Sequence, residues 1–166
     1  MNVNSIIMRF SSRGYSDPRE EAIRVFQKYR RHIESDRNNL VECMSCGRII
    51  HMRDAKGGYY ISPEESSAVE FESDNMWPQC PYCISSLEGN KKGFRKKLES
   101  RIGADRVKRL ELMRDASAGS IDAYKKLSKE DRLKAMSNHN RSYYEYKRCE
   151  YESLERLYSR DERVSI

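Results

Sequence analysis

The sequence lacks long apolar runs and is poor in hydrophobic residues. Of its 166 residues 37% are hydrophobic and 35% are charged, and the mean hydropathy is −0.93. The apolar residues at positions 6–8 are too few for the core of a signal peptide, and no run approaches the ~20 residues of a membrane span. We therefore expect a cytoplasmic protein with no membrane partner, whose small core would gain stability from a bound metal.

Histidine is also scarce, whereas basic residues are in excess. The three histidines are His32, His51 and His139, and the first and last fall in segments expected to be helical. A surface or packing role is the simpler interpretation for those two. The chain has 32 lysines and arginines against 26 aspartates and glutamates, which gives a formal net charge of +6. This balance favours a polyanionic partner such as a nucleic acid.

Five cysteines are present, and four of them form two C-x-x-C pairs. These pairs are Cys43 with Cys46 and Cys80 with Cys83. A two-residue spacer lets one tight turn present two sulfur atoms, so two such turns supply the four thiolates of a tetrahedral zinc site. Gly47 follows the first pair, at a point where a positive φ is often needed. We predict a structural zinc ion at these four cysteines and interpret Cys149 as a free helical cysteine.

We predict an α+β fold in three parts along the chain. They are 1–40, an N-terminal lead and helix; 41–103, a small core with the cysteine pairs and a basic helix; and 104–166, a C-terminal helical region. The lead has no periodic pattern up to position 16. The first helix should begin at Asp17-Pro18 and end near position 39, because aspartate can cap a helix and proline suits its first position.

Short strands and turns are expected between the two cysteine pairs. Strands over 49–50 and 59–61 would flank the turn-prone segment 54–58, and alternation predicts a third strand over 68–71. Between positions 64 and 74 there are five acidic residues and no basic one. A solvated loop is the simplest interpretation of this acidity, although such carboxylates can also hold a divalent cation.

The helix predicted over 91–102 has the densest positive charge in the chain. Phe94, Leu98 and Ile102 form its apolar stripe, and Gly103 marks its end. Its other face carries a single acidic residue, Glu99, and six basic residues. These six are Lys91, Lys92, Arg95, Lys96, Lys97 and Arg101. Because basic side chains on one helix face can neutralise phosphates, we predict that this set binds DNA.

Two further helices are expected, over 104–114 and over 128–159. Ser128 is a suitable cap for the longer one. Its apolar stripe is rich in tyrosine and has approximate heptad spacing, interrupted by polar residues at 140 and 147. The stripe consists of Leu133, Met136, Tyr143, Tyr144, Tyr151, Leu154 and Tyr158. Packing against other helices of the same chain is the simpler explanation of this stripe, and a homodimeric coiled coil is the alternative.

Several short motifs occur in order along residues 26–112. They are Cys43-Met44-Ser45-Cys46-Gly47, Gly58-Tyr59-Tyr60-Ile61-Ser62, Phe71-Glu72-Ser73-Asp74-Asn75, Gln79-Cys80-Pro81-Tyr82-Cys83, Leu87-Glu88-Gly89-Asn90 and Arg101-Ile102-Gly103. In this set the chain resembles the phage NinG/Rap recombination nucleases, a zinc-containing branch of the HNH (His-Me finger) superfamily. The resemblance implies a small ββα-metal core with a four-cysteine structural zinc. It also implies an association with the branched DNA of phage recombination.

The chain departs from the family pattern at the positions that carry its chemistry. The family places a histidine, the general base, where this chain has Tyr59. A tyrosine hydroxyl has an ordinary pKa of about 10 and is a poor base at neutral pH. The asparagine that usually follows the last cysteine is replaced by Ile84, which cannot coordinate Mg²⁺, and Ser86 stands at a further polar position. Asn75, which matches the asparagine that braces the family's loop, is retained.

Two of the three functions that the sequence leaves open involve DNA. The first is a non-catalytic protein that binds branched or structured DNA, with Trp77, Tyr59 and Tyr60 available to stack on bases. For Trp77 a place in the core is the simpler alternative. The second is an active endonuclease that uses Mg²⁺ or Mn²⁺, in which His51 replaces the base and Asp54 or Asp74 holds the cation.

The third function belongs to another class. A phage protein that has lost its catalytic residues can instead bind and modulate a host protein. The tyrosine-rich last helix would then be its contact surface, because exposed tyrosines favour interfaces.

Overall fold

The structure, a computed structural model, describes residues 17–164, so the lead predicted over 1–16 lies outside its described part. Helix α2 (Pro18–Ile33) begins as predicted, because the Asp17 side chain accepts a hydrogen bond from the backbone N–H of Arg19, 3.0 Å away. The helix ends earlier than predicted. The carboxylate of Asp36 accepts hydrogen bonds from the backbone of residues 38 and 40, which turns the chain into the first strand.

The strands form two separate antiparallel pairs. Strand β1 (Leu40–Glu42) pairs with β2 (Ile49–His51), and β3 (Lys56–Tyr59) pairs with β4 (Met76–Gln79). The predicted strand over 49–50 is confirmed, whereas the one predicted over 59–61 lies earlier in the chain and ends at position 59. Strands β2 and β3 do not pair with each other. Between them the backbone N–H groups of Asp54 and Ala55 donate to the carbonyl of His51, and this turn redirects the chain.

The third predicted strand, over 68–71, is wrong. This segment contains a short 3-10 helix, η1 (Ser67–Val69), and Ala68, Val69 and Phe71 are all buried. The backbone curls here because the carbonyl of Val69 accepts hydrogen bonds from the side chain of Asn75 and from the backbone of Glu72. Its apolar residues therefore fill the core from a turn and do not alternate across a sheet.

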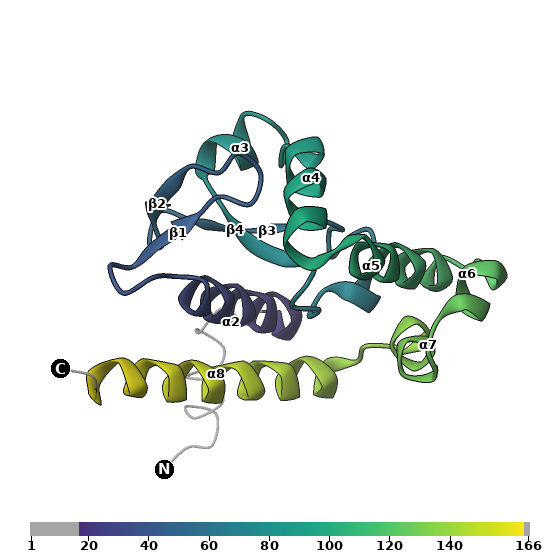
Figure 1. Ribbon diagram of the computed structural model, residues 1–166. Coiled ribbons are helices and arrows are strands. Elements are labelled where there is room, and N and C mark those ends of the chain that lie inside the picture. Colours follow the sequence, from purple (N-terminus) through teal and green to yellow (C-terminus); the bar gives the residue numbers. More distant parts are fainter. Residues whose placement is uncertain (1–16, 165–166) are drawn as a thin grey trace, which may run out of the picture.

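Helices make up the rest of the described chain. They are α3 (Pro81–Ser85), α4 (Lys91–Ile102), α5 (Ala104–Ser117), α6 (Ile121–Lys126), α7 (Lys129–Met136) and α8 (Arg141–Val164). Helix α4 has its predicted limits, and Gly103 ends it with a φ of 86°. The three helices α5, α6 and α7 follow one another at the end of the molecule away from β1 and β2 (Figure 1).

The long helix predicted over 128–159 is in fact two helices. Ser128 caps α7 as predicted, and its Oγ accepts a hydrogen bond from the backbone N–H of Asp131. The chain then leaves helical geometry, because His139 turns inward to the fully buried carboxylate of Glu70, 3.1 Å away. Asn140 starts the new helix by accepting a hydrogen bond from the backbone N–H of Tyr143.

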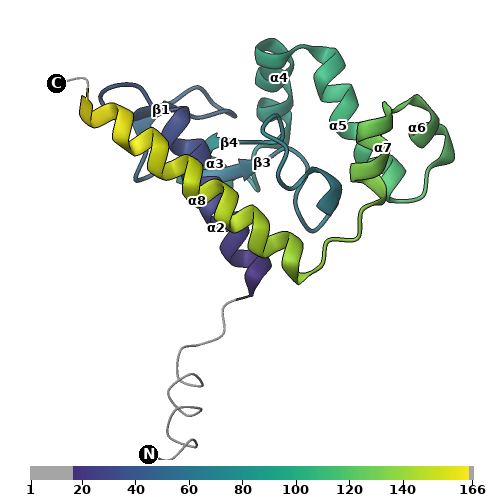
Figure 2. The same ribbon diagram turned by 90° about the horizontal axis from the view of Figure 1, so that it is seen from below.

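Helix α8 returns to α2 and packs against it along its length (Figures 1 and 2). The ring of Tyr151 lies 4.7 Å from that of Phe26 and 6.0 Å from that of Phe71. Packing inside the chain is therefore confirmed for the part of the stripe on α8. It is wrong for Leu133 and Met136 of α7, which are exposed. A homodimer through α8 stays a prediction, and it would have to use the opposite face of the helix.

A second core lies on the other side of the β3–β4 pair. It joins Phe94 and Leu98 of α4 to Leu110 and Met113 of α5, all of them fully buried. This packing fixes α4 against the strands that follow the first cysteine pair. None of the helices described among residues 17–164 combines the length and the apolarity needed to cross a membrane.

The α2–α8 contact should carry much of the stability. We expect Phe26→Ala to lower the free energy of unfolding by about 3–5 kcal/mol, because it leaves a cavity among buried aromatic rings. Tyr146→Ala removes an exposed ring of α8 and should change the free energy of unfolding by less than about 0.5 kcal/mol. Urea denaturation followed by circular dichroism measures both, and equal effects of the two substitutions would contradict this packing.

Candidate functional site

The four paired cysteines converge on one point. Their Sγ atoms all lie within 4.8 Å of one another, and those of Cys46 and Cys80 are 3.8 Å apart. Four sulfur atoms placed tetrahedrally at about 2.3 Å from one ion are about 3.8 Å apart. The donor set and its spacing therefore fit a tetrahedral four-thiolate metal site. The fifth cysteine, Cys149, is exposed on α8 and takes no part.

Backbone hydrogen bonds shape both cysteine turns. In the first, the N–H of Cys43 donates to the carbonyl of Arg48 and the N–H of Gly47 donates to the carbonyl of Cys43. Gly47 has a φ of 78°, as predicted for this position. In the second turn, Cys80 precedes α3 and its Sγ accepts a hydrogen bond from the backbone of Cys83. Each turn thus presents two sulfur atoms to the same point.

The four sulfur atoms have unequal surroundings. Cys43, Cys80 and Cys83 are buried, whereas Cys46 is exposed. Burial raises the pKa of Cys83 to about 12. Burial also acts to raise the pKa of Cys43, but hydrogen bonds from backbone N–H groups outweigh it and lower that pKa to about 7. The same hydrogen bonds therefore favour the thiolate form of Cys43 near neutral pH.

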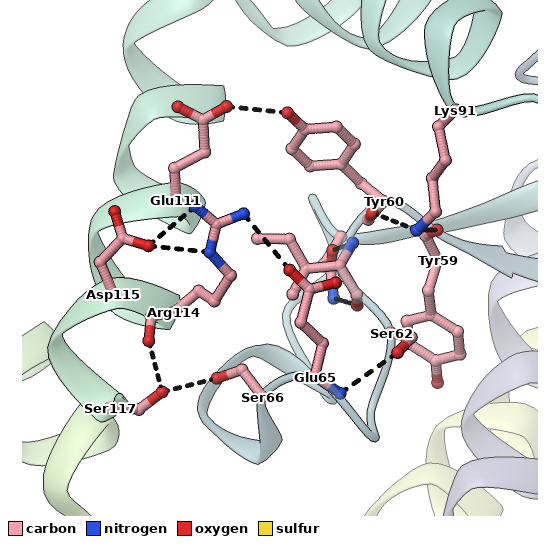
Figure 3. Close-up of polar contacts among 12 residues, drawn as sticks. Tyr59, Tyr60, Ser62, Glu65, Ser66, Lys91, Glu111, Arg114, Asp115 and Ser117 are labelled. Carbon is pink, nitrogen blue, oxygen red and sulfur yellow. Dashed lines mark hydrogen bonds and ion pairs between the residues drawn. The ribbon is translucent and has the colours of Figure 1, made fainter. Parts of the chain in front are cut away.

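Tyr59 and Tyr60 point to opposite sides of the strand end (Figure 3). Tyr59, at the position of the family histidine, packs against the cluster that contains Phe26, Phe71 and Tyr151. Burial raises the pKa of its hydroxyl far above the ordinary value. Tyr59 thus packs on the core between the strands and the α2–α8 pair, and it is unsuited to act as a base.

Tyr60 instead joins a polar group on the side of α4 and α5. Its hydroxyl donates to the carboxylate of Glu111, 2.8 Å away, and Arg95 donates to both groups. Burial, followed by the hydrogen bond to Glu111, raises the pKa of Tyr60 to about 12. Sequence reasoning missed Glu111. It lies 51 positions from Tyr60 within an ordinary helical pattern, so no local signal connected the two.

Asn75 is fully buried and braces the loop between β3 and β4. Its side chain accepts a hydrogen bond from the backbone N–H of Ile61 and donates to the carbonyls of Ile61 and Val69. All three distances are between 2.8 and 2.9 Å. This is the role that the resemblance implied. Ile84, which replaces the other asparagine, is a partly buried residue of α3.

His51, the predicted substitute base, and Asp74, a predicted cation ligand, have separate partners in the structure. His51 lies on β2, where its Nδ1 accepts a hydrogen bond from the backbone of Arg53. Asp74 is largely buried and forms a two-pronged ion pair with Arg106 of α5. Within residues 17–164, the cysteine set is the one group of three or more His, Cys, Asp and Glu side chains close enough to share an ion.

Trp77 is a core residue, and so it is not available to stack on bases. Its side chain lies among buried residues and is 7% exposed, and its Nε1 donates to the carbonyl of Asp74. The guanidinium groups of Arg30 and Arg101 lie over its ring, at 5.0 and 4.6 Å from the centroid. The simpler of the two predictions for Trp77 is the right one.

The six predicted DNA-binding residues of α4 differ in their surroundings. Arg95, Lys97 and Arg101 form ion pairs with glutamates. Lys91 donates to the backbone carbonyl of Tyr60, 2.7 Å away (Figure 3). Lys92 and Lys96 are exposed and have no carboxylate partner in the described part of the chain. They lie one turn apart, on the same side of the helix.

Comparison with protein-family models matches residues 11–141 to the model described as "Bacteriophage Lambda NinG protein". Searches of the curated proteins and of the solved structures found no match.

The metal site should be essential for folding of the central region. We expect Cys43→Ser to abolish metal binding and to remove most of the folding free energy, on the order of 5 kcal/mol or more. Mass spectrometry of the bound metal and a thermal melt measure the two effects. Cys149→Ser is the matched control and should leave both unchanged. An unaltered melt of the Cys43 variant would contradict a structural role for the site.

Proposed function

Because this chain belongs to the bacteriophage lambda NinG family, we propose that it is a zinc-stabilised DNA-binding protein that recognises branched or otherwise structured DNA in the cytosol of the bacterial host. The observation that carries the proposal is the exposed pair Lys92 and Lys96 on a helix whose start is held by the cysteine centre.

We assign the metal as zinc because all four donors are thiolates in tetrahedral spacing. With four protein ligands the ion would have no open position for a water, so its role is structural. The centre acts on the DNA-binding helix through Asn90. The side chain of this residue donates to the sulfur of Cys83 and accepts a hydrogen bond from the backbone of Gly93, in the first turn of α4.

Helix α4 is suited to the phosphate backbone of DNA. Lys91 and Lys92 stand in its first turn, where the free N–H groups of a helix also attract anions. Lys96 continues the same charged surface one turn later. Contacts of this kind are made to phosphates and carry no base sequence, so selectivity would come from the shape of the DNA.

The proposal is limited to binding because the surroundings of two residues argue against hydrolysis. Tyr59, where the resemblance implies a histidine, is partly buried against aromatic rings, and its hydroxyl is buried. The carboxylate of Asp74, a predicted cation ligand, is neutralised by Arg106. Incubation of a four-way junction with the protein and Mg²⁺ or Mn²⁺ tests this limit, and cleavage that is lost in His51→Ala or Asp74→Ala would restore the endonuclease alternative.

The binding proposal predicts that a double substitution of Lys92 and Lys96 by glutamate weakens DNA binding at least roughly tenfold, because it replaces two phosphate contacts by repulsion. Fluorescence anisotropy with a labelled four-way junction at fixed salt measures the affinity. The control is the same double substitution at Lys125 and Lys126, two exposed lysines of α6. Equal affinities of the two variants would refute the assignment to α4, provided that both bind zinc and melt like the wild type.

A further inference from the structure

We propose that glutamates of the protein itself compete with DNA for the cations of α4, and that the pair between Glu42 and Lys97 is the one that yields to phosphate. This inference rests on the proposed function and specifies how the same surface is regulated. It follows from the ion pairs of α4, most of which reach the helix from other elements.

Four glutamates face the basic side of α4, and three of them come from elsewhere in the fold. Glu34 follows α2, Glu42 belongs to β1 and Glu111 to α5, whereas Glu99 lies on α4 itself. They neutralise three cations. The pairs are Arg95 with Glu99 and Glu111, Lys97 with Glu42, and Arg101 with Glu34 and, at 4.0 Å, with Glu42. Half of the six predicted phosphate contacts are therefore occupied within the protein.

Two of these cations are held firmly. Arg95 lies 2.6 Å from the largely buried carboxylate of Glu111, which also accepts the hydroxyl of Tyr60. Arg101 lies 2.8 Å from Glu34 and over the ring of Trp77. Ion pairs with a buried carboxylate or an aromatic contact lose more than Coulomb energy when they break. Phosphate would have to replace several contacts at once to free either arginine.

Lys97 is held less firmly. The side chain of its partner Glu42 is 41% exposed, so water and salt screen the pair. Lys97 is also the immediate neighbour of Lys96, which has no carboxylate partner among the described residues. A DNA strand that contacts Lys92 and Lys96 reaches Lys97 by extending about 100° round the helix. The exchange replaces the contact of Lys97 with Glu42 by one with a phosphate.

The test compares three glutamate-to-glutamine variants that each remove one negative charge. Glu42→Gln removes the ion pair of Lys97, which keeps a hydrogen bond to the carbonyl of Cys43, and it leaves Arg101 paired with Glu34. Glu99→Gln lies on the same helix but leaves Arg95 paired with Glu111. Glu130→Gln lies on α7, and its side chain is 77% exposed. Binding of a labelled four-way junction is measured by anisotropy over a series of salt concentrations. Zinc content and melting temperature confirm that each variant is folded.

We expect Glu42→Gln to bind roughly two- to fivefold more tightly than the wild type, because an exposed ion pair no longer opposes binding. Its plot of log affinity against log salt should keep the wild-type slope, since Lys97 neutralises a phosphate in both proteins. Glu99→Gln and Glu130→Gln should keep an affinity close to that of the wild type. A general effect of charge would instead raise the affinity of Glu99→Gln at least as much as that of Glu42→Gln.

The outcomes separate this inference from the proposed function. If the wild type binds DNA and Glu42→Gln has the same affinity as the two controls, the competition is refuted while DNA binding stands. A wild-type slope that already corresponds to all six basic residues also refutes it. If neither the wild type nor any variant binds DNA at low salt, the proposed function fails, and the inference with it.

Discussion

The convergence of four sulfur atoms is the constraint on which the placement of the other elements depends. It joins two turns that are 34 positions apart in sequence, at Cys46 and Cys80. Neighbouring polar groups extend this junction, because Ser45 and Gln79 both donate to the carbonyl of Gly89. The next residue along the chain caps α4. The first turn of the basic helix is thus fixed by the same contacts that bring the cysteines together.

The end of strand β3 divides the molecule into two chemical environments. One tyrosine of the Tyr59-Tyr60 step enters the aromatic core beneath α8, and the other enters a polar group between α4 and α5. The family pattern expects a proton-transfer residue at the first of these positions. In this chain α2 and α8 cover that position. The side of the strand end that faces them contributes to stability, and the opposite side faces the charged residues of α4 and α5.

Local chemistry made part of this structure predictable. The caps at Asp17 and Ser128, the end of α4 at Gly103 and the cysteine spacing all depend on residues within a few positions of one another. The features that were predicted wrongly depend on residues far apart in the sequence. The break before α8 requires the contact between His139 and Glu70, 69 positions apart. Likewise, the glutamates that neutralise Lys97 and Arg101 lie 55 and 67 positions away, so the sequence overstated the open charge of α4.

The pairing of α2 with α8 has a consequence for how the protein is made. The contact between His32 and Glu155 spans 123 positions. At about 5–20 residues per second, a ribosome needs roughly 6–25 s to synthesise this interval. During that time α2 has been synthesised, but α8, which will cover its apolar face, has not. The nascent chain therefore exposes an aromatic surface for seconds, which is the condition under which chaperones bind.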